Sequence, residues 1–144
     1  INPDSGVYFS PSFAFYIFEG LYIIGLEKVA EDLMKQGWAL PLTKDIKTTP
    51  EYFHFRPQNS MSHGWSSSPT YYISKNVLGV HFPKAPDFSQ VDIQVRTAHV
   101  TYAEGSYPIP TGGVVEVKWH TDNQGKRIFD YVKVPIGVSY KIVE

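Results

Sequence analysis

The sequence predicts an α+β fold, in which a helical segment is followed by an antiparallel β-sandwich. Up to about residue 80 the apolar residues recur at helical spacing, and after it they recur at every second position. Short strand patterns separated by turn signals also appear only in the second part. We therefore predict a helical part at residues 1–80 and a β-sandwich at residues 81–144.

Two helices are predicted near the N-terminus. Ser10 and Pro11 form a helix start, because serine caps helices and proline suits the first helical position. Apolar residues then cover nearly every face up to Ile24, which is typical of a buried helix, and Gly25 is a stop. An amphipathic helix follows and is expected to end at Gly37. This order is the pattern of an inner and an outer helix in a double-layered helical array.

The rest of the chain supplies a long polar loop, a third helix and the strands. Residues 42–61 are polar and irregular, and such a loop is usually functional or mobile. A third helix is expected at about 68–76, with Gly79 as its stop. Alternating segments predict strands at 91–95, 115–119, 127–134 and 138–143, with a turn at 122–125. Glu104-Gly105 is expected to form a bend between strands.

Composition excludes several partners and cofactors. A formal net charge of −1 with 19% charged residues gives no electrostatic case for nucleic acid or an anionic membrane as a partner. No apolar run reaches the roughly 18 residues that a bilayer-spanning helix needs. The chain has no cysteine, no HExxH motif and no glycine-rich phosphate loop, so we expect no metal and no cofactor. Aromatic residues make up 15%, which suits β-rich packing or carbohydrate stacking.

Four residues stand out as candidates for chemistry, and each has a plainer interpretation. Glu51 lies beside the aromatic residues 52, 53 and 55, where an apolar setting would raise its pKa for acid–base work, or it is a solvated loop residue. His63 would donate to a substrate hydroxyl, or it caps or ties the loop before the third helix. Trp65 is a sugar platform or a core residue. Glu19 within an apolar helix needs a polar partner, and a structural one is expected.

Several motifs together resemble one enzyme family. They are His63-Gly64-Trp65-Ser66 with Pro69, Tyr71-Tyr72 and residues 77–80; residues 102–105, 108, 110–111, 113 and 115–119; residues 134–138; and the helix within 6–25. In order and spacing they resemble the C-terminal end of a bacterial α-L-rhamnosidase of glycoside hydrolase family 78. The resemblance implies the last helices of an (α/α)6 catalytic barrel followed by a C-terminal β-sandwich.

The resemblance also implies an activity and roles for particular residues. The family hydrolyses terminal α-L-rhamnosides with inversion, using two carboxylates. Its general base is a Glu in a Thr-Thr-x-Trp-Glu-like loop, to which Thr48-Thr49-Pro50-Glu51 corresponds, although Glu51 stands one residue early and the Trp is missing. His63 matches a His that contacts the sugar, and we assign Trp65 to substrate binding with it. The partner implied is a rhamnose-containing oligosaccharide or glycoside.

The general acid of that family has no counterpart in this chain. We therefore expect the isolated chain to be inactive. Its apolar first helix would lack the helices that normally cover it, so the chain is expected to self-associate through that face or to pack it on its own sandwich. Two alternatives stay open: a non-catalytic carbohydrate-binding or structural β-sandwich module, and a degenerate homologue whose loop has lost the base.

Overall fold

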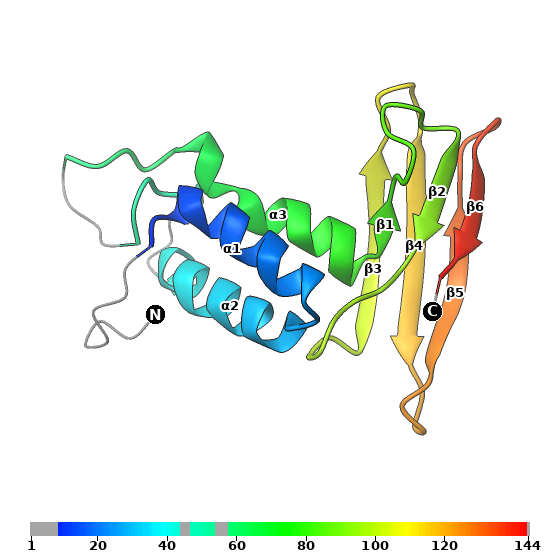
Figure 1. The fold of residues 1–144 in the computed structure, drawn as a ribbon, viewed down its shortest axis with the longest axis horizontal. Coiled ribbons are helices and arrows are strands. Elements are labelled where there is room, and N and C mark those ends of the chain that lie inside the picture. Colours follow the sequence, from blue (N-terminus) through cyan, green and yellow to red (C-terminus); the bar gives the residue numbers. More distant parts are fainter. Residues whose placement is uncertain (1–8, 44–46, 54–57, 144) are drawn as a thin grey trace. The chain divides into compact units, whose positions relative to one another are not determined.

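The computed structural model describes residues 9–43, 47–53 and 58–143. The chain divides into two compact units, residues 1–72 and residues 73–144, of which the first holds helices and the second the strands (Figure 1). The predicted boundary is at residue 80, whereas the division lies earlier because Val77 and Leu78 belong to the core of the strand unit. The α+β fold class, a helical segment followed by a β-sandwich, is confirmed.

Helix α1 (Pro11–Ile23) begins and ends where the sequence predicts. The Ser10 hydroxyl accepts a hydrogen bond from the Phe13 amide at 3.2 Å, which satisfies one of the amides left free at a helix start. At the other end the chain leaves the helix at Ile24, and Gly25 has φ +75°, a conformation that side chains with a Cβ rarely adopt.

Helix α1, whose apolar pattern is typical of a buried helix, is buried on one side only. Its inner face, with Ala14, Phe18 and Tyr22, packs against Ala30 and Met34 of α2 (Glu27–Thr43) in one apolar cluster. The described helices of the first unit cover only this side. Large apolar side chains therefore stay exposed on α1, on the turn after it and on the start of α2: Phe13, Phe15, Tyr16, Ile23, Ile24, Leu26 and Val29. The self-association expected of this face stays a prediction.

Helix α2 does not end at Gly37, as predicted, but continues to Thr43. Gly37 is buried, and a Cβ built there would lie 2.7 Å from Cε1 of Phe53. The glycine thus permits close packing of an aromatic ring on the helix rather than marking its end. Phe53 in turn packs edge-on against Trp38, with ring centroids 4.8 Å apart.

The third helical segment is α3 (Ser68–Tyr72), which passes into a π-helical turn, η3 (Ile73–Val77). Tyr72 is fully buried in the helical unit, stacks on Tyr22 at 5.7 Å and donates a hydrogen bond to the Phe15 carbonyl at 2.7 Å. Burial, followed by the adjacent Glu19 carboxylate, raises the pKa of Tyr72 above its usual range. Glu19 thus has the structural neighbour that its place in an apolar helix demands.

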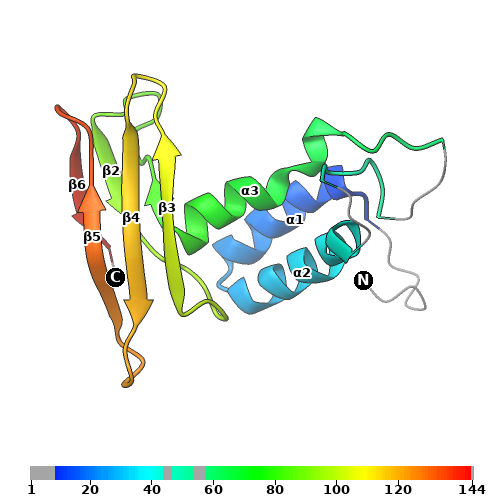
Figure 2. The ribbon, with the colours of Figure 1, turned by 180° about the vertical axis from the view of Figure 1, so that it is seen from behind.

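The second unit is a sandwich of two three-stranded sheets (Figures 1 and 2). One sheet has the order β1-β2-β6, from β1 (Val80–His81), β2 (Gln90–Ile93) and β6 (Ser139–Ile142). The other has the order β3-β4-β5, from β3 (Tyr102–Pro108), β4 (Val114–Thr121) and β5 (Arg127–Lys133). The β2–β6 pair is parallel, an exception to the predicted antiparallel pairing. Glu104-Gly105 lies inside β3 and is not a bend.

Trp119 of β4 lies at the centre of the sandwich and is fully buried. Its indole Nε1 donates to the Val77 carbonyl oxygen at 2.9 Å, which satisfies a buried polar atom on each side. The Arg127 guanidinium lies over the indole at 5.0 Å and donates to the Val95 carbonyl oxygen at 2.9 Å.

None of the helices in the described ranges is long and apolar enough to cross a membrane.

Candidate functional site

The loop that carries Glu51 is closed at its base by hydrogen bonds between its two arms. The His63 amide donates to the Thr49 carbonyl oxygen at 2.8 Å, and the Thr49 hydroxyl donates to the His63 carbonyl oxygen at 2.9 Å. Thr48 likewise donates its hydroxyl to the Met61 carbonyl oxygen. These bonds place the Thr-Thr-Pro-Glu segment beside the His63 segment, so the two motifs that are separate in sequence share one loop base.

Glu51 is half-buried and is held at both its backbone and its side chain. Its amide donates to the Ser60 carbonyl oxygen at 2.9 Å, and its carboxylate Oε2 accepts from the Ser60 amide at 3.2 Å. A carboxylate held in this way is oriented by the loop rather than moving freely in solvent. Of its aromatic neighbours, Tyr52 is exposed and Phe53 packs into the helical unit, while Phe55 lies outside the described residues.

His63 and Trp65 form an aromatic pair just before α3. Their ring centroids are 4.5 Å apart and the rings are tilted by 38°. His63 precedes a short 3-10 turn, η2 (Gly64–Ser66), but its imidazole makes no capping hydrogen bond there. The backbone of His63 ties the loop, which leaves the imidazole for another role. Trp65 is 63% exposed, so the core interpretation of this residue is wrong.

Trp65 lines an open pocket of about 420 Å³ within the helical unit. This volume is typical of small-molecule sites. The wall combines aromatic rings with serine hydroxyls, a mixture that matches the apolar faces and hydroxyl edges of a sugar ring. The lining residues are Ser12, Phe15, Tyr16, Gly64, Trp65, Ser67, Ser68 and Tyr71. Glu51 and His63 are not among them.

One polar atom of the pocket wall lacks a partner. The hydroxyl of Ser68 is buried, and it has no hydrogen-bond partner among the described residues. An unpaired buried hydroxyl costs free energy, and a ligand hydroxyl or a water in the pocket would remove that cost. Sequence reasoning missed the contribution of α1 to this wall. Ser12, Phe15 and Tyr16 share one helical face at i, i+3 and i+4, and this spacing was the available signal.

The described ranges contain no group of three or more His, Asp or Glu residues that could hold a metal ion. His54 lies outside those ranges.

Of three comparisons with known proteins, the comparison with solved structures finds similar chains. No family model and no curated protein matches the chain. Among solved structures the chain is similar to a glycoside hydrolase. That structure is the crystal structure of a GH78 family rhamnosidase of Bacillus sp. GL1, with a TM-score of 0.81 and 26% sequence identity. The match covers 93% of this chain and 15% of that chain.

The resemblance to family 78 that the motifs indicated is confirmed by this match, which extends over both units of the chain. The chain is therefore related in structure to part of a glycoside hydrolase. It spans 15% of the length of the protein it matches.

Proposed function

We propose that the chain is the C-terminal part of a glycoside hydrolase that cleaves terminal α-L-rhamnosides with inversion of configuration. The observation that carries this proposal is the likeness to a GH78 family rhamnosidase over 93% of the chain. The pocket at Trp65 and the anchored Glu51 loop support it, because both lie in the helical unit that carries the family-like motifs.

In this proposal Glu51 is the general base. Its carboxylate takes a proton from water while the water oxygen attacks the anomeric carbon, and the leaving oxygen receives a proton from an acid outside this chain. An inverting pair of carboxylates stands about 6.5–9.5 Å apart, which leaves room for that water. The hydrogen bond from the Ser60 amide fixes the direction of the Glu51 carboxylate.

His63 and Trp65 would hold the sugar. The imidazole of His63, free of a capping bond, donates to a rhamnose hydroxyl. The exposed indole of Trp65 offers an apolar face for the sugar ring, and the contact between the two rings limits the motion of both. Fixing these rings before the sugar arrives lowers the entropic cost of binding.

The test separates binding from chemistry by steady-state kinetics of the hydrolase that contains this chain, with a p-nitrophenyl α-L-rhamnoside as substrate. We expect Trp65→Ala to raise KM by about tenfold, because it removes a sugar contact. We expect Glu51→Gln to lower kcat by about 10²–10⁴-fold with little change in KM, as for loss of a general base. Met61→Ala is the matched control, because Met61 is exposed on the same loop but does not line the pocket.

Unchanged turnover after Glu51→Gln would show that Glu51 is not the general base. It would support the alternative of a degenerate homologue whose loop has lost the base. Unchanged KM after Trp65→Ala would remove the sugar contact. The 144-residue chain alone should show no hydrolysis, and measurable turnover by it would contradict the view that it is only part of the catalytic machinery.

A further inference from the structure

The outer face of the β3-β4-β5 sheet carries a polar and aromatic cluster that the proposed hydrolase activity does not use. Side chains alternate between the two faces of a strand, and Val115, Val117 and Trp119 of β4 point into the sandwich core. The residues between them therefore point outward. In this register Glu104 of β3 lies opposite Lys118 of β4, and Lys118 lies opposite Tyr131 of β5.

Glu104 is the centre of this cluster. Its carboxylate accepts hydrogen bonds from the hydroxyls of Tyr102 and Tyr131, the latter at 3.0 Å, and Lys118 Nζ lies 3.2 Å from it. The bond from Tyr102, then that from Tyr131, holds the pKa of Glu104 below its usual range. Glu104 thus stays ionised, and its carboxylate holds the hydroxyls of two tyrosines that come from the two edge strands of the sheet. We call Tyr102, Glu104, Lys118, Tyr131 and Lys133 the Glu104 face.

The charges of this surface are internally balanced. Lys133 pairs with Glu116 at 2.8 Å, and Lys118 pairs with Glu104. Asp130 stands at a β-bulge opposite Lys118 and Trp119, and its carboxylate lies 3.1 Å from Nδ1 of His120. A phosphate or sulfate group at either lysine would be repelled by the carboxylate that already pairs with it, Glu104 or Glu116. The chemistry that fits this surface is therefore neutral and polar.

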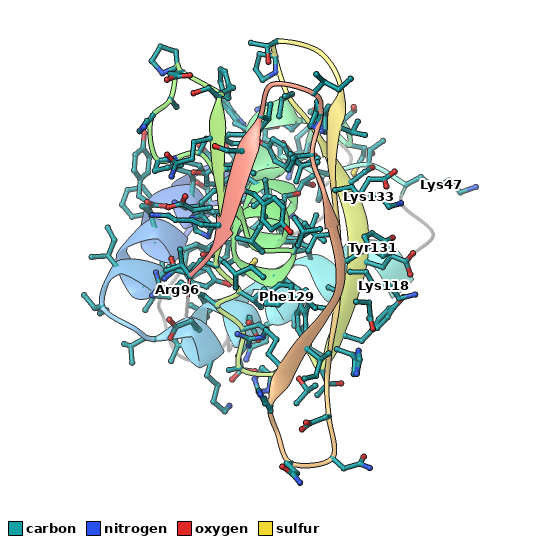
Figure 3. The ribbon with its side chains drawn as sticks, turned by 90° about the vertical axis from the view of Figure 1, so that its right-hand side faces the viewer. Lys47, Arg96, Lys118, Phe129, Tyr131 and Lys133 are labelled. Atoms are coloured by element: carbon teal, nitrogen blue, oxygen red, sulfur yellow. The ribbon has the colours of Figure 1, made fainter. Side chains whose placement is uncertain are left out.

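The Glu104 face offers hydrogen-bond donors and acceptors side by side. Both tyrosine oxygens keep acceptor capacity after donating to Glu104, and each lysine ammonium has more protons than its one carboxylate partner uses. Neighbouring sugar hydroxyls each donate and accept, so they match such an alternation. Lys118, Tyr131 and Lys133 follow one another along the sheet in Figure 3.

The face also has an aromatic platform whose position is fixed. Tyr102 is 50% exposed, and its ring is contacted by the Lys118 ammonium 5.8 Å from the ring centre while its hydroxyl donates to Glu104. Tyr131 has Lys133 4.5 Å from its ring centre and contributes mainly its hydroxyl. A ring held in place before binding loses little entropy when a ligand covers it.

We propose that the Glu104 face binds a neutral oligosaccharide, with the ring of Tyr102 against a sugar face and Lys118, Lys133 and the tyrosine oxygens on its hydroxyls. The site lies wholly within the strand unit, 73–144, and is separate from the pocket at Trp65. The binding proposed for this site does not depend on the proposed hydrolase activity.

The experiment uses the full chain on an array of neutral oligosaccharides and sulfated counterparts, followed by calorimetric titration with the strongest neutral binder. We expect Tyr102→Ala to weaken that binding by about tenfold or more, as for loss of an aromatic anchor. Glu104→Gln should weaken it as well, since the rings lose their shared carboxylate. Tyr140→Ala is the matched control, because Tyr140 is similarly exposed, at 46%, on β6 of the other sheet.

Trp65→Ala separates this site from the pocket of the helical unit, and it should leave binding at the Glu104 face unchanged. The proposal is overturned if no neutral oligosaccharide binds, if only sulfated ones bind, or if Tyr102→Ala and Tyr140→Ala behave alike. Loss of binding by Trp65→Ala alone would assign the sugar to the pocket and also overturn it. Near-ultraviolet circular dichroism of each variant confirms that the strand unit is folded.

Discussion

Two tryptophans of this chain differ in role, and their burial distinguishes a packing residue from one that is available to a ligand. Trp119 is fully buried, and its indole nitrogen donates to the Val77 carbonyl oxygen, so it is a packing residue. Trp65 is 63% exposed and faces a pocket, so it is available to a ligand. The residue type alone does not distinguish the two. Only their neighbours separate them: Trp119 belongs to an alternating strand, and Trp65 follows a His-Gly pair in the short turn η2.

His81 makes the stability of the strand unit dependent on pH. It is half-buried in β1, with Nε2 3.1 Å from the Gln94 carbonyl oxygen, and burial lowers its pKa from the ordinary value of about 6.5. Below pH 6.5 the unfolded chain therefore binds more protons than the folded one. Stability is full above that pH and falls as the pH drops toward the folded-state pKa.

Urea denaturation at several pH values between 5 and 8, followed by tryptophan fluorescence to which Trp38, Trp65 and Trp119 contribute, measures this dependence. We expect His81→Gln to flatten the part of the slope that lies below pH 6.5, whereas His99→Gln, at an exposed position outside the strands, should not. Equal effects of the two substitutions would contradict the assignment to His81.

At the scale of elements, the helical glycines Gly37 and Gly20 differ in the space that is available for a side chain. Both lie inside helices, but a Cβ at Gly37 would meet the ring of Phe53 at 2.7 Å, whereas a Cβ at Gly20 would meet nothing within 4 Å. Phe53 is held between Trp38 and Phe9, so it cannot easily move away.

We expect Gly37→Ala to lower the free energy of unfolding by about 1 kcal/mol, because a clash of about 1–3 kcal/mol outweighs the gain of helix propensity. Gly20→Ala should raise it by about 0.5–1 kcal/mol. Urea midpoints at an unchanged slope of free energy against denaturant measure both. A gain in stability at Gly37 would show that the contact with Phe53 is loose.

Local signals in the sequence predict most elements, and distant contacts explain the misses. Ser10-Pro11 and Gly25 mark the ends of α1 because caps depend on nearby residues only. The parallel pairing of β2 with β6 joins segments about fifty residues apart, which no local pattern encodes. Gly105 resembles a turn residue, yet it lies in a strand, where it pairs with Val117 of β4, a contact that the local sequence does not encode.

In the candidate site, too, the features set by local sequence could be predicted and those set by distant contacts could not. The motif containing His63 and Trp65 is contiguous, so it could be found in the sequence, and the loop bonds bring Glu51 to the same base. The contribution of Phe15 and Tyr16 to the pocket was missed, because an apolar helix with no polar face is expected to be buried throughout, and only the spacing of these residues from Ser12 indicates a shared face. Their exposure follows from which helices cover α1, which is a property of the whole unit.

At the scale of the whole molecule, the chain joins a helical unit with an exposed apolar face to a self-contained β-sandwich. The sandwich has its own core around Trp119, whereas α1 leaves several large apolar side chains uncovered. Such a face is typical of a helix that packs against further helices. The proposal that this chain is part of a larger hydrolase accounts for the face, because additional helices of that protein would cover it.

The most direct test is to isolate the natural product from its source cells with an antibody to this chain, and to measure its intact mass and its hydrolysis of a p-nitrophenyl α-L-rhamnoside. We predict a product several times larger than 16.3 kDa that hydrolyses the rhamnoside with inversion. A product of about this mass that binds sugars without hydrolysing them would contradict the account and favour an independent binding module.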